Sequence, residues 1–182
     1  MKKTLQMVAV LLMVGLFSAV SLVSMFQYAQ PLIEINRQRE LETAILQVLP
    51  QAKSYQTLEE KEGLYKGLDS DGNPIAYAFV SEGSGYQGKI RMMVGINLEL
   101  TNLLGLEVLE NIETPGLGAK IDEDDFKAQF VGLTVLPQIE YVQNRIPEKP
   151  NTIQSITGAT VSSRAVVRTL NKDIARIRKE QK

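Results

Sequence analysis

The segment Ile75-Ala76-Tyr77-Ala78-Phe79-Val80 has the β-branched and aromatic content of a strand. The turn signal Asp71-Gly72 precedes it, so the stretch from Leu64 to Val80 is predicted to form a β-hairpin. Glycines at 83, 85 and 88 then lead into a second strand, Lys89-Ile90-Arg91-Met92-Met93-Val94-Gly95-Ile96, and Leu103 to Leu109 has the pattern of a third. The short connections predict an antiparallel meander.

Helical patterns follow these strands. Asp122 to Phe130 begins with acidic residues and places Phe126 and Phe130 four apart, which predicts a short helix. Thr134 to Val142 is predicted to return as a strand. After a proline-bounded break at 147–150, the chain ends in a predicted amphipathic helix with apolar residues at three- and four-residue intervals, namely Val167, Leu170, Ile174 and Ile177. The predicted fold class is α+β, an antiparallel sheet with flanking helices.

The N-terminal segment is long and apolar enough to cross a membrane. Leu5 to Phe26 is 22 residues without a charge, which as a helix spans roughly the 30 Å of a bilayer core. Lys2 and Lys3 precede it, so the positive-inside tendency places the N-terminus in the cytoplasm. A cleaved signal peptide is the alternative, although its apolar region is usually only about 7–15 residues.

A second helical pattern follows the apolar segment. Its apolar positions lie among charged residues from Ile33 to Leu49, and Pro50 marks its end. We therefore expect residues 1–30 to form a cytoplasmic stub and one transmembrane helix, and residues 31–182 to form an extracytoplasmic domain.

The composition excludes several classes of function. Lys and Arg number 20 against 21 Asp and Glu, so no net positive field favours nucleic acid. The chain has no His and no Cys, which removes thiol nucleophiles, His-based triads and cysteine-held clusters. Redox chemistry would then need an organic cofactor. A metal hydrolase using Asp122, Glu123, Asp124 and Asp125 is disfavoured, because consecutive acids on a helix point in different directions; we predict neither a metal site nor a catalytic side chain.

A hydroxyl-rich segment precedes the last predicted helix. Ser155-Ile156-Thr157-Gly158-Ala159-Thr160-Val161-Ser162-Ser163 holds five hydroxyls around a glycine. Free backbone N–H groups and the helix dipole attract anions at such a position, so a phosphate would fit there. The alternative is an ordinary helix N-cap, in which Ser162 or Ser163 satisfies the first-turn amides.

Two further loops carry recognisable patterns. Glu110-Asn111-Ile112-Glu113-Thr114-Pro115-Gly116-Leu117-Gly118-Ala119-Lys120 follows a predicted strand and is rigid by composition. Its alternative interpretation is a type II turn on Pro115-Gly116 with Glu113 and Lys120 merely solvated. In Gly85-Tyr86-Gln87-Gly88, Tyr86 could stack on a ring or pack on the sheet as a hairpin aromatic.

The core Thr157-Gly158-Ala159-Thr160 is similar to the flavinylation motif of the FMN-binding domain family, and Glu-Thr-Pro-Gly-Leu-Gly at 113–118 resembles that family's second signature. The second signature especially resembles the G subunit of the Rnf ion-translocating electron transport complex, and within the family the chain is most similar to that subunit. The resemblance implies that a flavin transferase joins FMN through a phosphoester to Thr160. It also implies a flavin environment drawn from both motifs: Ser155, Thr157, Gly158, Ala159, Val161 and Ser162, with Glu113, Thr114, Gly116, Leu117 and Gly118.

The same resemblance implies a function and a location. The chain would be the electron-transfer subunit of a membrane Rnf-type complex, without independent turnover. It would be single-pass in the inner membrane with its C-terminal domain in the periplasm, and its partners would be other membrane subunits, the flavin transferase and the bilayer. The alternatives are the C subunit of a sodium-pumping NADH:quinone reductase, which is generally longer, and a membrane-anchored, non-redox ligand-binding or scaffold module.

Overall fold

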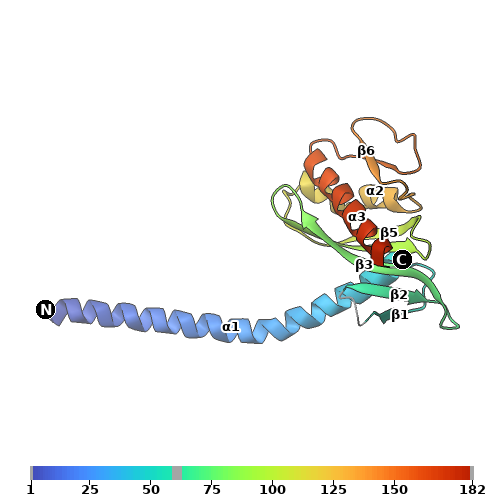
Figure 1. The fold of residues 1–182 in the computed structure, drawn as a ribbon. Helices are drawn as coiled ribbons and strands as arrows, with labels where there is room; N and C mark the ends of the chain where they lie inside the picture. Colours follow the sequence, from blue (N-terminus) through green and yellow to red (C-terminus); the bar gives the residue numbers. More distant parts are fainter. Residues whose placement is uncertain (1, 59–62, 181–182) are drawn as a thin grey trace. The chain divides into compact units, whose positions relative to one another are not determined.

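A five-stranded antiparallel sheet, in the order β1-β2-β3-β4-β5, organises the C-terminal part of the chain (Figure 1). This computed structural model describes residues 2–58 and 63–180. The chain divides into two units, Met1–Glu40 and Leu41–Lys182. The strands all lie in the second unit: β1 Ser54–Thr57, β2 Leu64–Leu68, β3 Pro74–Ser84, β4 Lys89–Asn97 and β5 Leu103–Asn111.

The predicted hairpin and meander are confirmed. β2 pairs with β3 and β3 with β4, and the register of β4 on β5 sets Ile90 opposite Asn111. That register brings the start of β4 beside the end of β5, because neighbouring antiparallel strands run in opposite directions. Strand β1 was not predicted, since Ser54–Thr57 is short, polar and mostly exposed and so lacks an alternating apolar signal.

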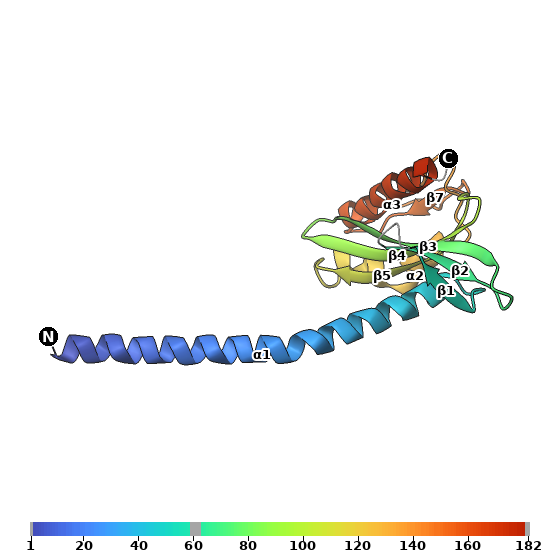
Figure 2. The same ribbon diagram turned by 60° about the horizontal axis from the view of Figure 1, so that its bottom comes forward.

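The two faces of the sheet carry separate cores. Successive side chains of a strand point to opposite faces, so Phe79 and Met92 join one apolar cluster while Ala78 and Met93 join another. Helix α3, Thr160–Glu180, covers the first face with its predicted apolar residues Val167, Leu170, Ile174 and Ile177, all buried. The last turns of α1, residues 41–48, cover the second face (Figure 2).

Close packing against the second face depends on a glycine. A Cβ added to Gly95 in β4 would lie 2.2 Å from the carbonyl oxygen of Val48, which ends α1. Gly105 in β5 stands opposite Gly95 and would bring a Cβ to 3.1 Å from the Cα of Val48. The helix end therefore lies almost directly on the sheet backbone.

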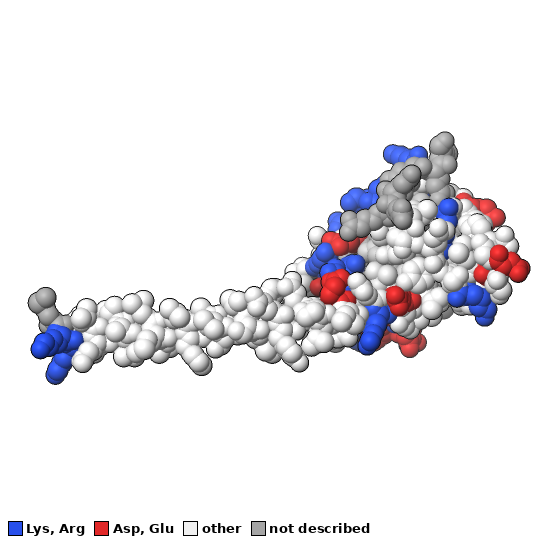
Figure 3. All heavy atoms as spheres, turned by 90° about the horizontal axis from the view of Figure 1, so that it is seen from below, with Lys and Arg blue, Asp and Glu red and all other residues white. Residues whose placement is uncertain are grey.

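Helix α1, Lys2–Val48, includes both of the predicted N-terminal helical segments, and Pro31 does not interrupt it. The helix is long and apolar enough to cross a membrane by length and composition, a test that a signal sequence near an N-terminus also passes. Figure 3 shows its surface free of Lys, Arg, Asp and Glu for most of its length beyond the first lysines, Lys2 and Lys3. Its end at Val48 agrees with the stop predicted from Pro50.

Two predicted elements differ from the structure. The helix expected over Asp122–Phe130 is split into η1 Gly118–Asp122, α2 Asp124–Lys127 and η2 Ala128–Phe130. Extended backbone at Glu123 separates the first two pieces. Phe126 and Phe130 are both buried with ring centroids 5.3 Å apart, so the apolar spacing was informative although the helix is not continuous.

The strand predicted over Thr134–Val142 is confirmed only for its last three residues. Thr134 forms only an isolated bridge to Asn102. Regular pairing begins at β6, Glu140–Val142, which pairs in parallel with β7, Thr152–Gln154. Pro137 has no backbone N–H to give to a neighbouring strand, which prevents a continuous ladder through this segment.

Candidate functional site

The three sequence motifs meet at the side chain of Glu113. Its Oε1 accepts hydrogen bonds from the backbone N–H groups of Tyr86 (2.9 Å), Gln87 (2.9 Å) and Gly88 (3.4 Å), in the turn between β3 and β4. Its Oε2 accepts a hydrogen bond from the hydroxyl of Ser162, in the first turn of α3. The sheet makes this possible, because Glu113 follows the end of β5 and the Tyr86–Gly88 turn precedes the start of β4.

Two glycines leave room for this carboxylate. A Cβ added to Gly85 would lie 2.4 Å from Oε1 of Glu113, and one added to Gly118 would lie 2.5 Å from Oε2. The Gly118 position would also place a Cβ 2.7 Å from the hydroxyl oxygen of Ser162. These separations are shorter than non-bonded atoms tolerate, so any larger residue would displace the carboxylate or the Ser162 hydroxyl.

The carboxylate of Glu113 is buried and is held by hydrogen bonds. Glu113 is 6% exposed, and within the described residues no Lys or Arg forms an ion pair with it. Burial raises the pKa of Glu113, but hydrogen bonds from Ser162 and from the amides of Gln87, Gly88 and Tyr86 outweigh that effect and leave the pKa below its usual value. Glu113 is therefore a buried anion, and the interpretation of it as merely solvated was wrong.

The hydroxyls of the second motif have different surroundings. Thr157 donates to Oδ1 of Asn144 at 3.0 Å, and Ser163 donates to the carbonyl of Ala159 at 3.1 Å. Thr160, the first residue of α3, is half-buried, and in the described part of the chain its hydroxyl makes no hydrogen bond. Thr160 thus has a hydroxyl that is available at the N-terminus of a 21-residue helix.

The N-cap interpretation of Ser162 and Ser163 was wrong. Both residues lie inside α3, which begins at Thr160. Ser162 is directed at Glu113, and the hydroxyl of Ser163 accepts the N–H of Ile156 at 3.1 Å, outside the helix. The first N–H groups of a helix have no partner within it, so those of α3 remain suited to an anion.

The Glu113–Gly118 loop forms the predicted turn. The N–H of Leu117 donates to the carbonyl of Thr114 at 3.1 Å, and Gly116 has φ +74°, as residue i+2 of a type II turn requires. The turn directs Leu117, 48% exposed, toward the acceptor motif: a Cβ added to Gly158 would lie 3.4 Å from Cδ2 of Leu117. The two predicted motifs are therefore neighbours in space.

The remaining predicted site residues differ in exposure. Thr157 and Gly158 are exposed, Ser155 and Ala159 are buried, and Val161 is 41% exposed. Tyr86 is 71% exposed, so the interpretation of it as an aromatic packed on the sheet was wrong. Sequence reasoning missed Asn144, which has φ +49°, a conformation that Asn adopts more readily than most residues. Its contact with Thr157 carries no sequence signal.

The residues present at this site are of the kinds that bind FMN. The hydroxyl of Thr160 adjoins the first-turn N–H groups of α3, which have no partner within the helix and suit a phosphate. Leu117 and Val161 offer exposed apolar side chains to a flat aromatic ring. Leu117 belongs to the Thr114–Gly118 turn, so backbone polar groups accompany this apolar side chain near Gly158.

The acidic residues at 122–125 lie outside the candidate site. The described residues contain no group of three or more acidic side chains that could hold an ion. Asp122 and Asp124 instead lie 3.7 and 3.4 Å from the Nζ of Lys127, which also binds Glu107 at 2.9 Å. Lys127 therefore lies within ion-pair distance of three carboxylates.

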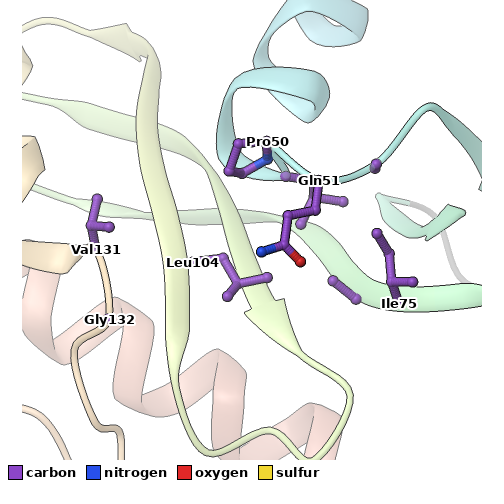
Figure 4. A pocket seen from close by; sticks show the side chains of 9 residues that line it. Pro50, Gln51, Ile75, Leu104, Val131 and Gly132 are labelled. Atoms are coloured by element: carbon purple, nitrogen blue, oxygen red, sulfur yellow. The ribbon is translucent and has the colours of Figure 1, made fainter. Parts of the chain in front are cut away.

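A separate cavity of about 260 Å³ lies on the second face of the sheet (Figure 4). It is mainly apolar, and Val131 and Ile75 lie on opposite sides of Leu104 in it. None of the motif residues lines it, so the cavity is not part of the candidate site.

Comparison with known proteins identifies the class. The model of the FMN-binding domain family matches residues 85–175, which include all three motifs. The chain belongs to the FMN-binding domain family.

Its relatives within that family include G subunits of ion-translocating complexes. The chain is 28% identical to the G subunit of the ion-translocating oxidoreductase complex of Methanosarcina acetivorans, over 93% of this chain and 92% of the relative. It is 31% identical to the protein of the same name from Vibrio vulnificus, over 84% and 80%. The crystal structure of Shewanella oneidensis NqrC matches with a TM-score of 0.57 and 19% identity, covering 66% of this chain and 64% of NqrC, which shows a shared fold.

Proposed function

We propose that this chain is the electron-transfer subunit of a membrane Rnf-type ion-translocating oxidoreductase complex, with FMN attached covalently to Thr160. The observation that carries the proposal is the available Thr160 hydroxyl at the N-terminus of α3, next to the Glu113–Gly118 turn. Family membership and the G-subunit relatives support the cofactor and the type of complex.

Attachment requires only one reactive group from this chain. The oxygen of Thr160 attacks the FMN phosphorus of FAD, a new O–P bond forms, the pyrophosphate bond breaks, AMP leaves and the hydroxyl proton is released. The flavin transferase supplies the catalysis. Once attached, FMN supplies reversible electron transfer, while this chain binds and orients it and limits its contact with water.

Each part of the site has a distinct role in this proposal. The free N–H groups of the first turn of α3 hold the phosphate, and Leu117 and Val161 contact the ring. Thr114, Gly116 and Gly118 contribute backbone groups. Ser155, Thr157, Gly158 and Ala159 shape the acceptor segment, and Ser162 joins that segment to Glu113.

We also propose where the two parts of the chain lie relative to the membrane. Residues 1–30 form the anchor in the inner membrane, and residues 31–182 form the flavin domain on its outer side. Lys2 and Lys3, followed by a segment without charges, support this orientation. The partners are then the bilayer, the flavin transferase and the other membrane subunits.

The test is the intact mass of the full chain after co-expression with a flavin transferase and purification in detergent. We expect yellow protein whose mass is increased by one FMN moiety. Thr160→Ala should abolish this mass increase. Thr157→Ala, the matched change at the neighbouring threonine, should still show it. An unmodified, colourless wild-type chain contradicts the proposal, and an adduct that persists in Thr160→Ala assigns the acceptor elsewhere.

A further inference from the structure

We propose that Glu113 is a positioning residue that holds the acceptor Thr160 in the orientation needed for flavin transfer, and is not itself a ligand of the flavin. This inference rests on the proposed function. Both carboxylate oxygens of Glu113 are already bonded to this protein, Oε1 to the Tyr86–Gly88 amides and Oε2 to Ser162. Little hydrogen-bonding capacity is left for a cofactor.

Helix geometry connects Glu113 to Thr160. Residues of an α-helix are separated by about 100° of rotation, so two residues two positions apart point to nearly opposite sides. Ser162, 2% exposed, points inward to Glu113. By this geometry Thr160 points to the other side of the same turn, and the residue is partly exposed. Holding Ser162 from inside sets the rotation of the turn and with it the direction of the Thr160 hydroxyl.

The Glu113 side chain also connects the Glu113–Gly118 loop to the first turn of α3. Glu113 begins the loop that carries Leu117, and its side chain is enclosed by Gly85 and Gly118. The Tyr86–Gly88 turn, the Glu113–Gly118 loop and the first turn of α3 are thus bonded to one buried group. A change at Glu113 would allow all three segments to shift, and small shifts of a reacting group reduce rates strongly.

The test measures transfer of FMN from FAD to the full-length chain in detergent by a purified flavin transferase, followed by intact mass. We expect Glu113→Ala and Ser162→Ala each to lower kcat by about tenfold or more, with the KM for the chain changed by less than about twofold. Glu113→Gln has the same length and can still hydrogen-bond both partners, so it should retain a rate within about threefold of wild type. Glu110→Gln, a change at an exposed acid of the same segment, is the matched control and should equal wild type.

The double variant tests whether the two residues act through one bond. Glu113→Ala with Ser162→Ala should be no slower than the slower single variant, whereas independent structural damage would multiply the two losses. Wild-type rates in both single variants, or a Glu113→Gln rate as low as that of Glu113→Ala, would overturn the inference. If Glu113→Ala does not fold, Ser162→Ala alone decides it. A wild-type chain that is never modified contradicts the proposed function instead, so the two failures are distinguishable.

Discussion

The hydroxyl of Ser162 donates a hydrogen bond to the Glu113 carboxylate across 49 positions of sequence, and both residues are buried. This contact joins the first turn of α3 to the loop after β5. Breaking it by Ser162→Ala should lower the free energy of unfolding by about 1–3 kcal/mol, because a buried acceptor loses its donor. Denaturant unfolding of the full chain in detergent, followed by circular dichroism, measures the change; an unchanged midpoint contradicts it.

The lowered pKa of Glu113 predicts an acid-dependent loss of stability. In the unfolded chain this carboxyl titrates near the ordinary value of about 4.3. Because its pKa is lower in the folded protein, its contribution is fully present above the unfolded value and is lost as the pH falls through the folded value. Glu113→Gln should lose less stability than wild type between about pH 5 and the folded pKa. Melting temperatures across this range test the prediction, and parallel curves for the two proteins contradict it.

Gly118→Ala should be more harmful than Gly116→Ala. At Gly118 the new methyl group would meet Glu113 and Ser162 within 2.7 Å, which should cost about 1–3 kcal/mol and slow flavin transfer. At Gly116 the space is open, and the cost of about 1 kcal/mol comes from the positive φ. Gly72→Ala in the β2–β3 turn, also open and with φ +82°, is the matched control outside the site. Equal effects of the Gly116 and Gly118 changes on transfer would contradict the steric argument.

Gly95→Ala should loosen the end of α1 from the sheet. Its methyl group would meet the Val48 carbonyl at 2.2 Å, and this backbone group can move only if the helix end moves. We expect a loss of stability of about 2 kcal/mol or more and faster amide hydrogen exchange over residues 44–52. Gly83→Ala is the comparison, since it would meet the side chain of Thr169, on the opposite face of the sheet. Unchanged amide hydrogen exchange over residues 44–52 in Gly95→Ala would contradict the prediction, because the end of α1 would then accommodate the methyl group without loosening.

Ser81→Ala should destabilise the contact between β3 and α3. The Ser81 hydroxyl donates to Oδ2 of Asp173 at 2.7 Å, and Asp173 is 5% exposed. Within the described residues, the carboxylate would then keep the ion pair with Arg176, at 3.5 Å and largely exposed. The expected cost is about 1–3 kcal/mol, read from chemical denaturation, and flavin transfer by the folded variant should be unchanged. Slower transfer would indicate that α3 shifts as a unit.

The sequence predicted an element correctly where the signal for that element lies within one continuous stretch of the chain. Strands β2 to β5 and helix α3 were predicted because apolar residues recur along each segment with the period of its structure. The segment from Gly118 to Val142 was predicted poorly, since its pieces are short and are determined by contacts with other elements. Phe126 and Phe130 identified the buried side of this segment without defining its backbone.

The candidate site likewise has features that the sequence predicted and features that depend on contacts between distant residues. The residues of the two motifs were identified from sequence, and the structure places Leu117 beside Gly158. The roles of individual hydroxyls were not evident: the sequence around Ser162 is typical of a helix cap, but Ser162 lies within α3 and bonds Glu113. Asn144 was missed because only its position in space relates it to Thr157.

The sequence by itself determined the apolar N-terminal helix, the meander, the last helix and the family motifs, because each depends on residues close together in the chain. The tertiary structure alone decided that the Tyr86–Gly88 turn, Glu113 and Ser162 share one buried carboxylate. The physical reason is the register of β4 on β5, with Ile90 opposite Asn111, which brings the turn before one strand to the loop after the other. Packing of α3 on the same sheet then brings Ser162 to Glu113 and leaves Thr160, in the same turn, partly exposed.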